Sequence, residues 1–127
     1  MIEHVNPESL FSSPAFSQGT IAPAGRTLYV GGQNGRDASG ALLEGVVAQT
    51  AQAIANVRAV LEAAGATADD VAKLTIHLDD SVDPAEAYGA SVEAWGAHRT
   101  AVTVLLVSRL GVPGALVEID AIAALPG

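Results

Sequence analysis

The chain has 127 residues, and 50% of them are hydrophobic while only 4% are aromatic. One domain spanning residues 1–127, with a core of aliphatic side chains, is therefore the simplest expectation. The 14 acidic residues outnumber the 6 basic ones, and the net charge of −8 argues against nucleic acid and anionic membranes as partners. The absence of cysteine excludes disulfides and thiolate chemistry. No leader-like segment or membrane-length apolar run is visible, so a cytoplasmic location is expected.

Residues 48–65, which read AQTAQAIANVRAVLEAAG, predict the main helix of the fold. Alternating steps of three and four residues place six side chains on one helical face, namely Val47, Thr50, Ile54, Val57, Leu61 and Ala64. The opposite face is predicted to be the polar one and carries Gln49, Gln52, Asn56 and Glu62. We expect this helix to begin near Leu43 or Glu44 and to stop at Gly65.

Three short strands are predicted before this helix, at residues 2–5, 16–21 and 27–31. The connecting segment between the second and the third strand contains Pro23 and Gly25, which favour a turn. These two strands are therefore expected to pair as a hairpin.

After the main helix, Thr67 is typical of the residue that caps the start of a short helical turn. Residues 73–79 alternate between polar and apolar side chains, which predicts a strand with one buried face. Asp83 followed by Pro84 is typical of a helix start, and a second helix is expected to run to Trp95 or Ala97.

Residues 101–107, reading AVTVLLV, are apolar on both faces and predict a central strand that is covered on both sides. Residues 116–123 predict the last strand, with Glu118 and Asp120 on one face of it about 7 Å apart. The order of elements indicates an α+β fold with both helices on one face of a sheet. The other face would be bare and apolar, so we expect a homo-oligomer that covers it.

Several ordered segments resemble the RidA (YjgF) family, among them the helix at 48–65, LTIHLDD, GGQNG, FSQG, and SRL with LVEIDAIA. The resemblance implies a chorismate-mutase-like fold, with a six-stranded mixed sheet and two helices packed on one face. It also implies a homotrimer with three small-molecule clefts at the subunit interfaces. The activity best known for the family is hydrolysis of enamines and imines made by pyridoxal-phosphate enzymes, which releases ammonia and a 2-keto acid. It implies no cofactor bound to the chain itself.

In the family's deaminases an arginine on the fifth strand grips the substrate carboxylate. When the chain is aligned on the Arg109-Leu110 pair, Val102 takes that arginine's place, and a valine cannot bond a carboxylate. Phe16 replaces a frequent tyrosine, Gly31 a frequent serine and Tyr88 a frequent asparagine. The cleft is therefore predicted to be more apolar and less attractive to anions than a deaminase cleft.

Glu118 aligns with the family glutamate that positions a hydrolytic water, and is the candidate catalytic residue. Gly32 could present its backbone N–H to a ligand, and Thr103 is expected to line the site. Arg99 lies three residues before Val102 and could supply a substitute anchor. The three histidines, His4, His77 and His98, are scattered over separate elements, so no metal site is expected.

Three hypotheses about function follow. In the preferred one, the protein binds or hydrolyses a small metabolite without the arginine-dependent deaminase mechanism, and Glu118 orients the water. In the second, it is an enamine/imine deaminase that uses Arg99 as the carboxylate anchor. In the third, it is a non-catalytic binding or chaperone-like module. The sequence leaves the ligand, the pathway and the occurrence of turnover open.

Overall fold

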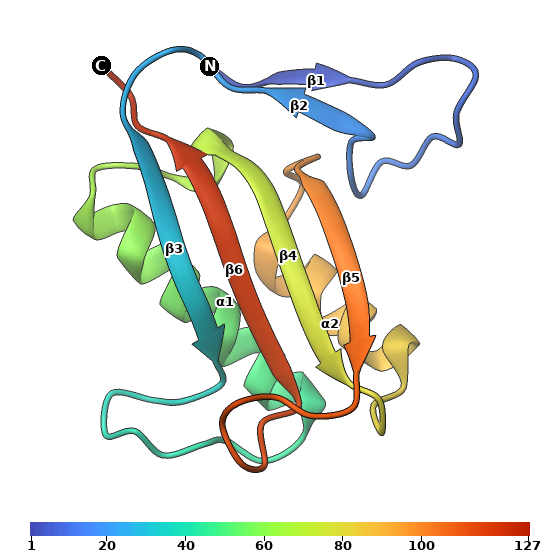
Figure 1. The fold of residues 1–127 in the computed structure, drawn as a ribbon, viewed down its shortest axis with the longest axis vertical. Coiled ribbons are helices and arrows are strands. Elements are labelled where there is room, and N and C mark those ends of the chain that lie inside the picture. The colour runs from blue at the N-terminus through green and yellow to red at the C-terminus, as the bar shows by residue number, and fades with distance from the viewer.

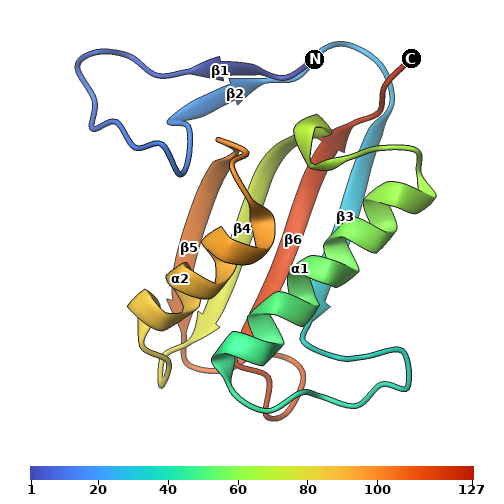
Figure 2. The same cartoon turned by 180° about the vertical axis from the view of Figure 1, so that it is seen from behind.

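Both helices lie on one face of a four-stranded sheet, and the other face carries no helix (Figures 1 and 2). The computed structural model describes residues 1–127. In chain order the elements are β1 (Glu3–Val5), β2 (Gly19–Ile21), β3 (Thr27–Asn34), α1 (Val46–Ala63), a short 3-10 helix (Ala68–Asp70), β4 (Val71–Asp79), α2 (Pro84–Trp95), β5 (Ala101–Val107) and β6 (Val117–Ala124). The predicted α+β class with both helices on one face is confirmed.

The main sheet has the strand order β3-β6-β4-β5, in which β4 and β5 are parallel and the other neighbours are antiparallel. A parallel pair needs a crossover connection, and α2 supplies it. The six strands do not form one sheet, however, because β1 and β2 pair with each other in a separate two-stranded ribbon. The six-stranded mixed sheet of the sequence analysis is therefore divided into a four-stranded mixed sheet and this ribbon.

The predicted hairpin between the second and third strands is wrong. Strand β2 pairs with β1, while β3 pairs with β6 along most of its length. The ribbon docks on the end of the main sheet, where Thr20 donates its hydroxyl to the carbonyl of Ala72 and Ser17 bridges to Ala101. The segment 22–26 does turn the chain, but it passes from the ribbon into the sheet (Figure 1).

Helix α1 begins at Val46, after Gly45 with a φ of 86°, two to three residues later than the predicted start near Leu43 or Glu44. It ends before Gly65, whose φ of 77° matches the predicted stop. The face assignment is wrong at two positions near the start. Val47 is 52% exposed, whereas Gln49 is only 2% exposed and makes hydrogen bonds to two loops. Helix α2 begins as predicted, with the Asp83 carboxylate accepting from Ala85 N at 3.0 Å and Pro84 in the first turn.

Strand β5 is an edge strand and not the predicted central strand. Within the single chain its apolar residues Val104, Leu105 and Leu106 are 51%, 45% and 54% exposed. A run of apolar residues predicts that the side chains are buried, but it does not distinguish burial within one chain from burial against a second chain. Here the chain leaves this edge and the open face of the sheet uncovered (Figure 1).

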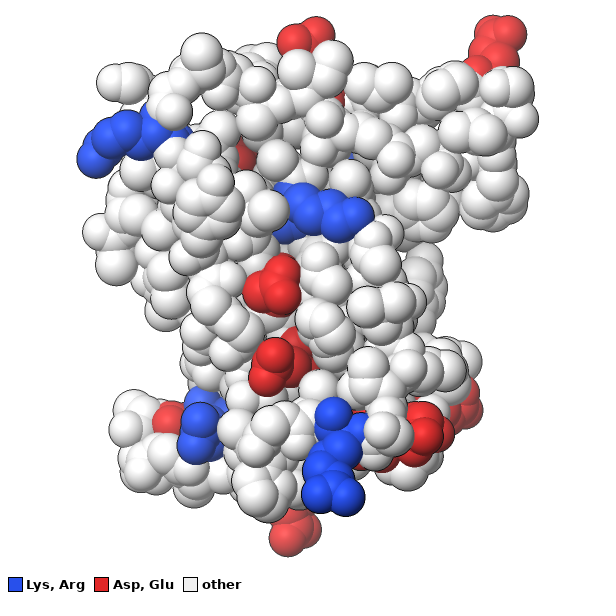
Figure 3. Space-filling view, viewed as in Figure 1, with Lys and Arg blue, Asp and Glu red and all other residues white.

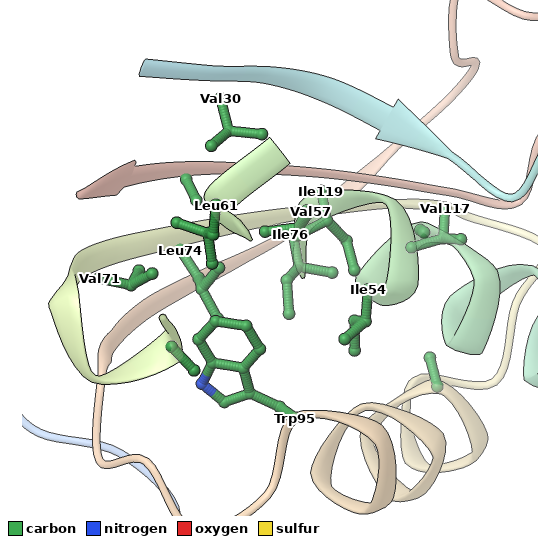
Figure 4. Packing of buried hydrophobic residues seen from close by; sticks show 14 of the residues in the cluster. Val30, Ile54, Val57, Leu61, Val71, Leu74, Ile76, Trp95, Val117 and Ile119 are labelled. Carbon is green, nitrogen blue, oxygen red and sulfur yellow. The ribbon is translucent and has the colours of Figure 1, made fainter. Parts of the chain in front are cut away.

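The core lies between the helices and the sheet, and its fully buried side chains include Val57, Leu61, Leu78, Val117 and Ile119. In Figure 4, Trp95 at the end of α2, Ile54 from α1 and Ile76 from β4 surround the same space. No helix is long and apolar enough to cross a membrane.

Candidate functional site

The candidate residues fall on opposite faces of the main sheet. Val102 stands beside Leu74 in the β4–β5 register, and both face the helices. Glu118 stands beside His77 in the β4–β6 register, on the open face. Residues directly opposite each other in a sheet share a face, so these pairings separate Val102 from Glu118 within one chain.

The helix-side group surrounds a pocket of about 310 Å³ between α2 and the sheet. Thirteen of its 17 lining residues are hydrophobic, and Phe16, Tyr88 and Val102 are among them. Gly31, Gly32, Arg99 and Thr103, which the sequence analysis assigned to the same cleft, do not line this pocket. Its wall contains no Lys, Arg, His, Asp or Glu. The pocket reaches the surface, because Tyr88 and Val104 in its wall are about half exposed (53% and 51%).

Two basic residues, Arg58 and His98, lie near the pocket, but both bind other groups of the chain. The Arg58 guanidinium stacks 5.0 Å from the centre of the Trp95 ring and donates to the carbonyls of Ala94 and Trp95 at the end of α2. His98 packs edge-on against the same ring, and its Nδ1 lies 2.7 Å from an Asp69 carboxylate oxygen. Neither side chain lines the pocket.

Arg99 does not line this pocket either. Its Nε and Nη2 donate to the carbonyl of Ser13 at 3.1 and 2.7 Å, and the Arg99 carbonyl lies 2.9 Å from His4 Nδ1. In this geometry the guanidinium holds the N-terminal loop against the chain. A role as carboxylate anchor would require Arg99 to leave the Ser13 carbonyl.

On the open face, Glu118 lies against a β-bulge in β3. The register between β3 and β6 shifts by one residue between Val30 and Gln33, so Gly31 and Gly32 together oppose Asp120. A Cβ on Gly32 would lie only 2.6 Å from Glu118 Oε2, so any larger residue at this position would displace the carboxylate from its present place. A Cβ on Gly31 would meet nothing within 4 Å.

The Glu118 carboxylate has one hydrogen-bond donor in the chain. Asn34 Nδ2 reaches its Oε1 at 3.4 Å and the Val117 carbonyl at 3.1 Å. His77, beside Glu118 on the next strand, has a buried Nδ1 without any hydrogen-bond partner. Sequence analysis did not select Asn34 or His77, although the polar side of residues 73–79 placed His77 on this face.

Thr103, the remaining predicted site residue, also lies on the open face and accepts a hydrogen bond from Lys73 Nζ at 2.6 Å. Figure 3 shows charged groups in a line down the middle of this face, with uncharged surface on both sides. The chain contains no group of three or more His, Cys, Asp or Glu side chains that could hold a metal ion.

Two lowered pKa values belong to turns away from both groups. Hydrogen bonds from the Ser39 hydroxyl and backbone lower the pKa of Asp37, and Ser81 does the same for the pKa of Asp79. In each turn the carboxylate accepts from a hydroxyl at 2.6 Å. The hydrogen bonds behind these pKa shifts stabilise local turns, and they do not indicate a binding or catalytic site.

Thr50 is the site feature that sequence analysis missed on the helix side. Its side chain is 1% exposed, lines the pocket and has an Oγ1 without a hydrogen-bond partner. The sequence did indicate this position, because helical spacing placed the Thr50 hydroxyl on the apolar face of the main helix.

Comparisons with known proteins agree with this architecture. Residues 8–125 match the model of the family described as endoribonuclease L-PSP. A RutC family protein of Pyrococcus horikoshii is 38% identical over 102 residues, which cover 79% of this chain and 80% of that protein. The 2-iminobutanoate/2-iminopropanoate deaminase of Bos taurus is 38% identical over 103 residues, covering 77% of this chain and 72% of the deaminase.

Solved structures show the same relationship. YyfB from Yersinia pestis, a protein of unknown function of the conserved Rid family, has a TM-score of 0.86 and 34% identity, with 98% of both chains covered. RidA from an Antarctic Psychrobacter has a TM-score of 0.73 and 32% identity, covering 91% of this chain and 92% of that one. The chain therefore belongs to the endoribonuclease L-PSP family, which is the RidA (YjgF) family.

Proposed function

We propose that this protein is a homotrimer with small-molecule clefts at its subunit interfaces, and that it hydrolyses a small uncharged imine-type metabolite without the arginine-dependent deaminase mechanism. The observation that carries the proposal is the pocket wall around Val102, which contains no charged side chain. A deaminase of 2-imino acids needs a cation there, since a buried carboxylate without a partner is strongly disfavoured.

Assembly would bring the two groups of site residues together. Glu118 and Val102 face opposite sides of their own sheet, so one chain cannot place both against one ligand. The exposed apolar edge of β5 and the open face offer the surface through which a second copy could approach. A cleft between subunits would then combine the pocket of one copy with the Glu118 carboxylate of another.

In such a cleft the Glu118 carboxylate would act as general base. It accepts a hydrogen bond from a water molecule and takes its proton as the water adds to the carbon of a C=N bond. The nitrogen takes up this proton, which gives a carbinolamine. Its C–N bond then breaks as the hydroxyl proton moves to the departing nitrogen, and a ketone or aldehyde and an amine are released. Gly32 leaves room for the carboxylate, and Asn34 restrains one of its oxygens.

The deaminase relatives support a second candidate, hydrolysis of 2-imino acids with Arg99 as the anchor. The position of Arg99 weighs against it, because two guanidinium nitrogens are held by the Ser13 carbonyl. The two candidates differ in the charge of their substrate and in which residue each one needs.

One experiment separates them. The purified oligomer is assayed with a neutral imine, N-benzylidenemethylamine, by its conversion to benzaldehyde, and with 2-iminopropionate made in situ, by release of ammonia. We expect the protein to accelerate hydrolysis of the neutral imine only. This activity should be lost in Glu118→Gln and retained in Arg99→Ala. Acceleration of 2-iminopropionate that disappears in Arg99→Ala would replace the proposal by the deaminase. No turnover of either substrate by a folded trimer would refute hydrolysis and leave a binding module.

A further inference from the structure

The wall of the pocket between α2 and the sheet contains a buried hydroxyl group, that of Thr50, which has no hydrogen-bond partner. Thr50 is 1% exposed, and its Oγ1 has no hydrogen-bond partner in the chain. Such a group is destabilising in an apolar interior, and most buried polar atoms in folded proteins are satisfied. Because Thr50 also lines the pocket, a bound molecule is able to supply the missing partner.

From this we infer that the pocket binds a neutral, mainly apolar molecule that makes one hydrogen bond to Thr50. The inference rests on the proposed function in that it names the ligand class of the same site. It goes further by placing recognition inside one subunit, on the helix side of the sheet. The subunit interfaces of the proposed cleft are not needed for this step.

The volume limits the size of the molecule. An apolar cavity of roughly 150 Å³ accepts benzene, and ligand pockets begin at roughly 300 Å³. At about 310 Å³, the pocket is suited to a single substituted ring or a branched chain of similar size. Larger molecules would have to extend outward past Tyr88, which is 53% exposed.

The wall defines the chemical class. It is built mainly from aliphatic side chains with Trp95, Phe16 and Tyr88, and besides Thr50 its polar groups are the Ser91 hydroxyl, the Trp95 indole N–H and the hydroxyl of the half-exposed Tyr88. Trp95 Nε1 already donates to Thr100 Oγ1 at 3.2 Å. The Ser91 hydroxyl already donates to the Tyr88 carbonyl at 2.8 Å. An anionic ligand would therefore lose its hydration without gaining a cationic partner, whereas a ligand with one hydroxyl or carbonyl group would form a hydrogen bond with Thr50.

Trp95 makes the binding measurable, because it is the single tryptophan of the chain and lines the pocket. The oligomer is titrated at neutral pH with toluene, benzyl alcohol and benzoate while tryptophan emission is recorded. We expect saturable changes with toluene and benzyl alcohol, and binding of benzoate at least about tenfold weaker. Equal binding of benzoate would overturn the assignment of a neutral ligand.

Thr50→Val tests the hydroxyl, since valine keeps the shape of threonine and removes only the polar atom. We expect a loss of roughly 3- to 10-fold in affinity for benzyl alcohol and no change for toluene. An equal effect on both probes, or none on benzyl alcohol, would refute the role of the hydroxyl. Because the variant also removes an unsatisfied buried group, it should fold at least as well as the natural chain.

A second pair of variants tests the location. Ala87 lies in the pocket wall on α2, whereas Ala85 lies on the exposed side of the same helix. We expect Ala87→Leu to abolish the response to toluene and Ala85→Leu to preserve it. A folded natural chain without a saturable response to any probe would refute this inference and leave Glu118-dependent turnover as a separate question. Conversely, Glu118→Gln should keep probe binding even if it abolishes hydrolysis.

Discussion

Replacing Gln49 by leucine tests whether a buried amide joins two loops that the sequence does not relate. Gln49 is 2% exposed. Its Oε1 accepts from Leu116 N at 2.8 Å, and its Nε2 donates to the carbonyls of Leu43 at 2.9 Å and Gly114 at 3.4 Å. One side chain therefore connects the segment before α1 to the loop that precedes β6.

Leucine has a similar size and buries more apolar surface, but it leaves Leu116 N–H and the Leu43 carbonyl without their partner. Each backbone group that loses its partner costs about 1–3 kcal/mol when water cannot replace it. Both residues are partly buried, so we expect Gln49→Leu to lower the free energy of unfolding by about 3 kcal/mol in total. For a chain of this length that corresponds to a fall in Tm of roughly 10 °C.

The measurement is thermal and urea unfolding of both proteins at one fixed protein concentration, because association changes the apparent stability. Gln52→Leu is the matched control, since the Gln52 amide donates only to Asn56 on the same helix, at 2.8 Å. The Gln52→Leu substitution should lower the free energy of unfolding by less than about 1 kcal/mol. Equal destabilisation by the two substitutions, or a stable Gln49→Leu protein, would refute the reasoning.

Three further outcomes are expected from the same geometry. Gly32→Ala should push the Glu118 carboxylate aside and reduce hydrolysis about 10- to 100-fold, while Gly111→Ala, with nothing within 4 Å of its added Cβ, should have no effect. Gly35→Ala should destabilise the protein by about 3 kcal/mol or more in urea unfolding, because the new Cβ would lie 2.4 Å from the Gln49 backbone. Asp37 has a lowered pKa, so its stabilisation is present above the usual value of 3.8 and is lost as the pH falls through the native value. The stability difference between the natural chain and Asp37→Asn should therefore disappear in acid; a difference that persists there would contradict this.

Local sequence was sufficient where the cause of a structure is local. The cap at Asp83, the stop at Gly65 and the alternation along β4 depend on residues a few positions apart, and each appears as predicted. Pairing of distant segments could not be read in this way. Strand β3 pairs with β6, about 90 residues later, so the turn-forming residues 22–26 predicted a hairpin that does not exist.

The candidate site shows the same limit. Phe16, Gly31, Tyr88 and Val102 were assigned to one cleft from a resemblance, which carries long-range information that composition and periodicity lack. Within one chain Phe16, Tyr88 and Val102 line the helix-side pocket, whereas Gly31 does not. The separation of Val102 from Glu118 required the strand register, because a shift by one residue moves a side chain to the other face. Thr50 was placed on the buried face by its helical spacing, but its missing partner is visible only in three dimensions.

This separation leads to a test of whether recognition and hydrolysis depend on assembly in different ways. Leu105 is 45% exposed on the open face beside His77, whereas Val104 faces the pocket. An aspartate at 105 costs the single chain little, but burying that charge between copies would be strongly unfavourable. We expect Leu105→Asp to yield monomers in light scattering, to lose Glu118-dependent hydrolysis and to keep the Trp95 response to toluene. Val47→Asp, at an equally exposed position on the outer side of α1, should leave the oligomer intact. Loss of toluene binding in a folded Leu105→Asp monomer would show that the pocket is completed by a second copy.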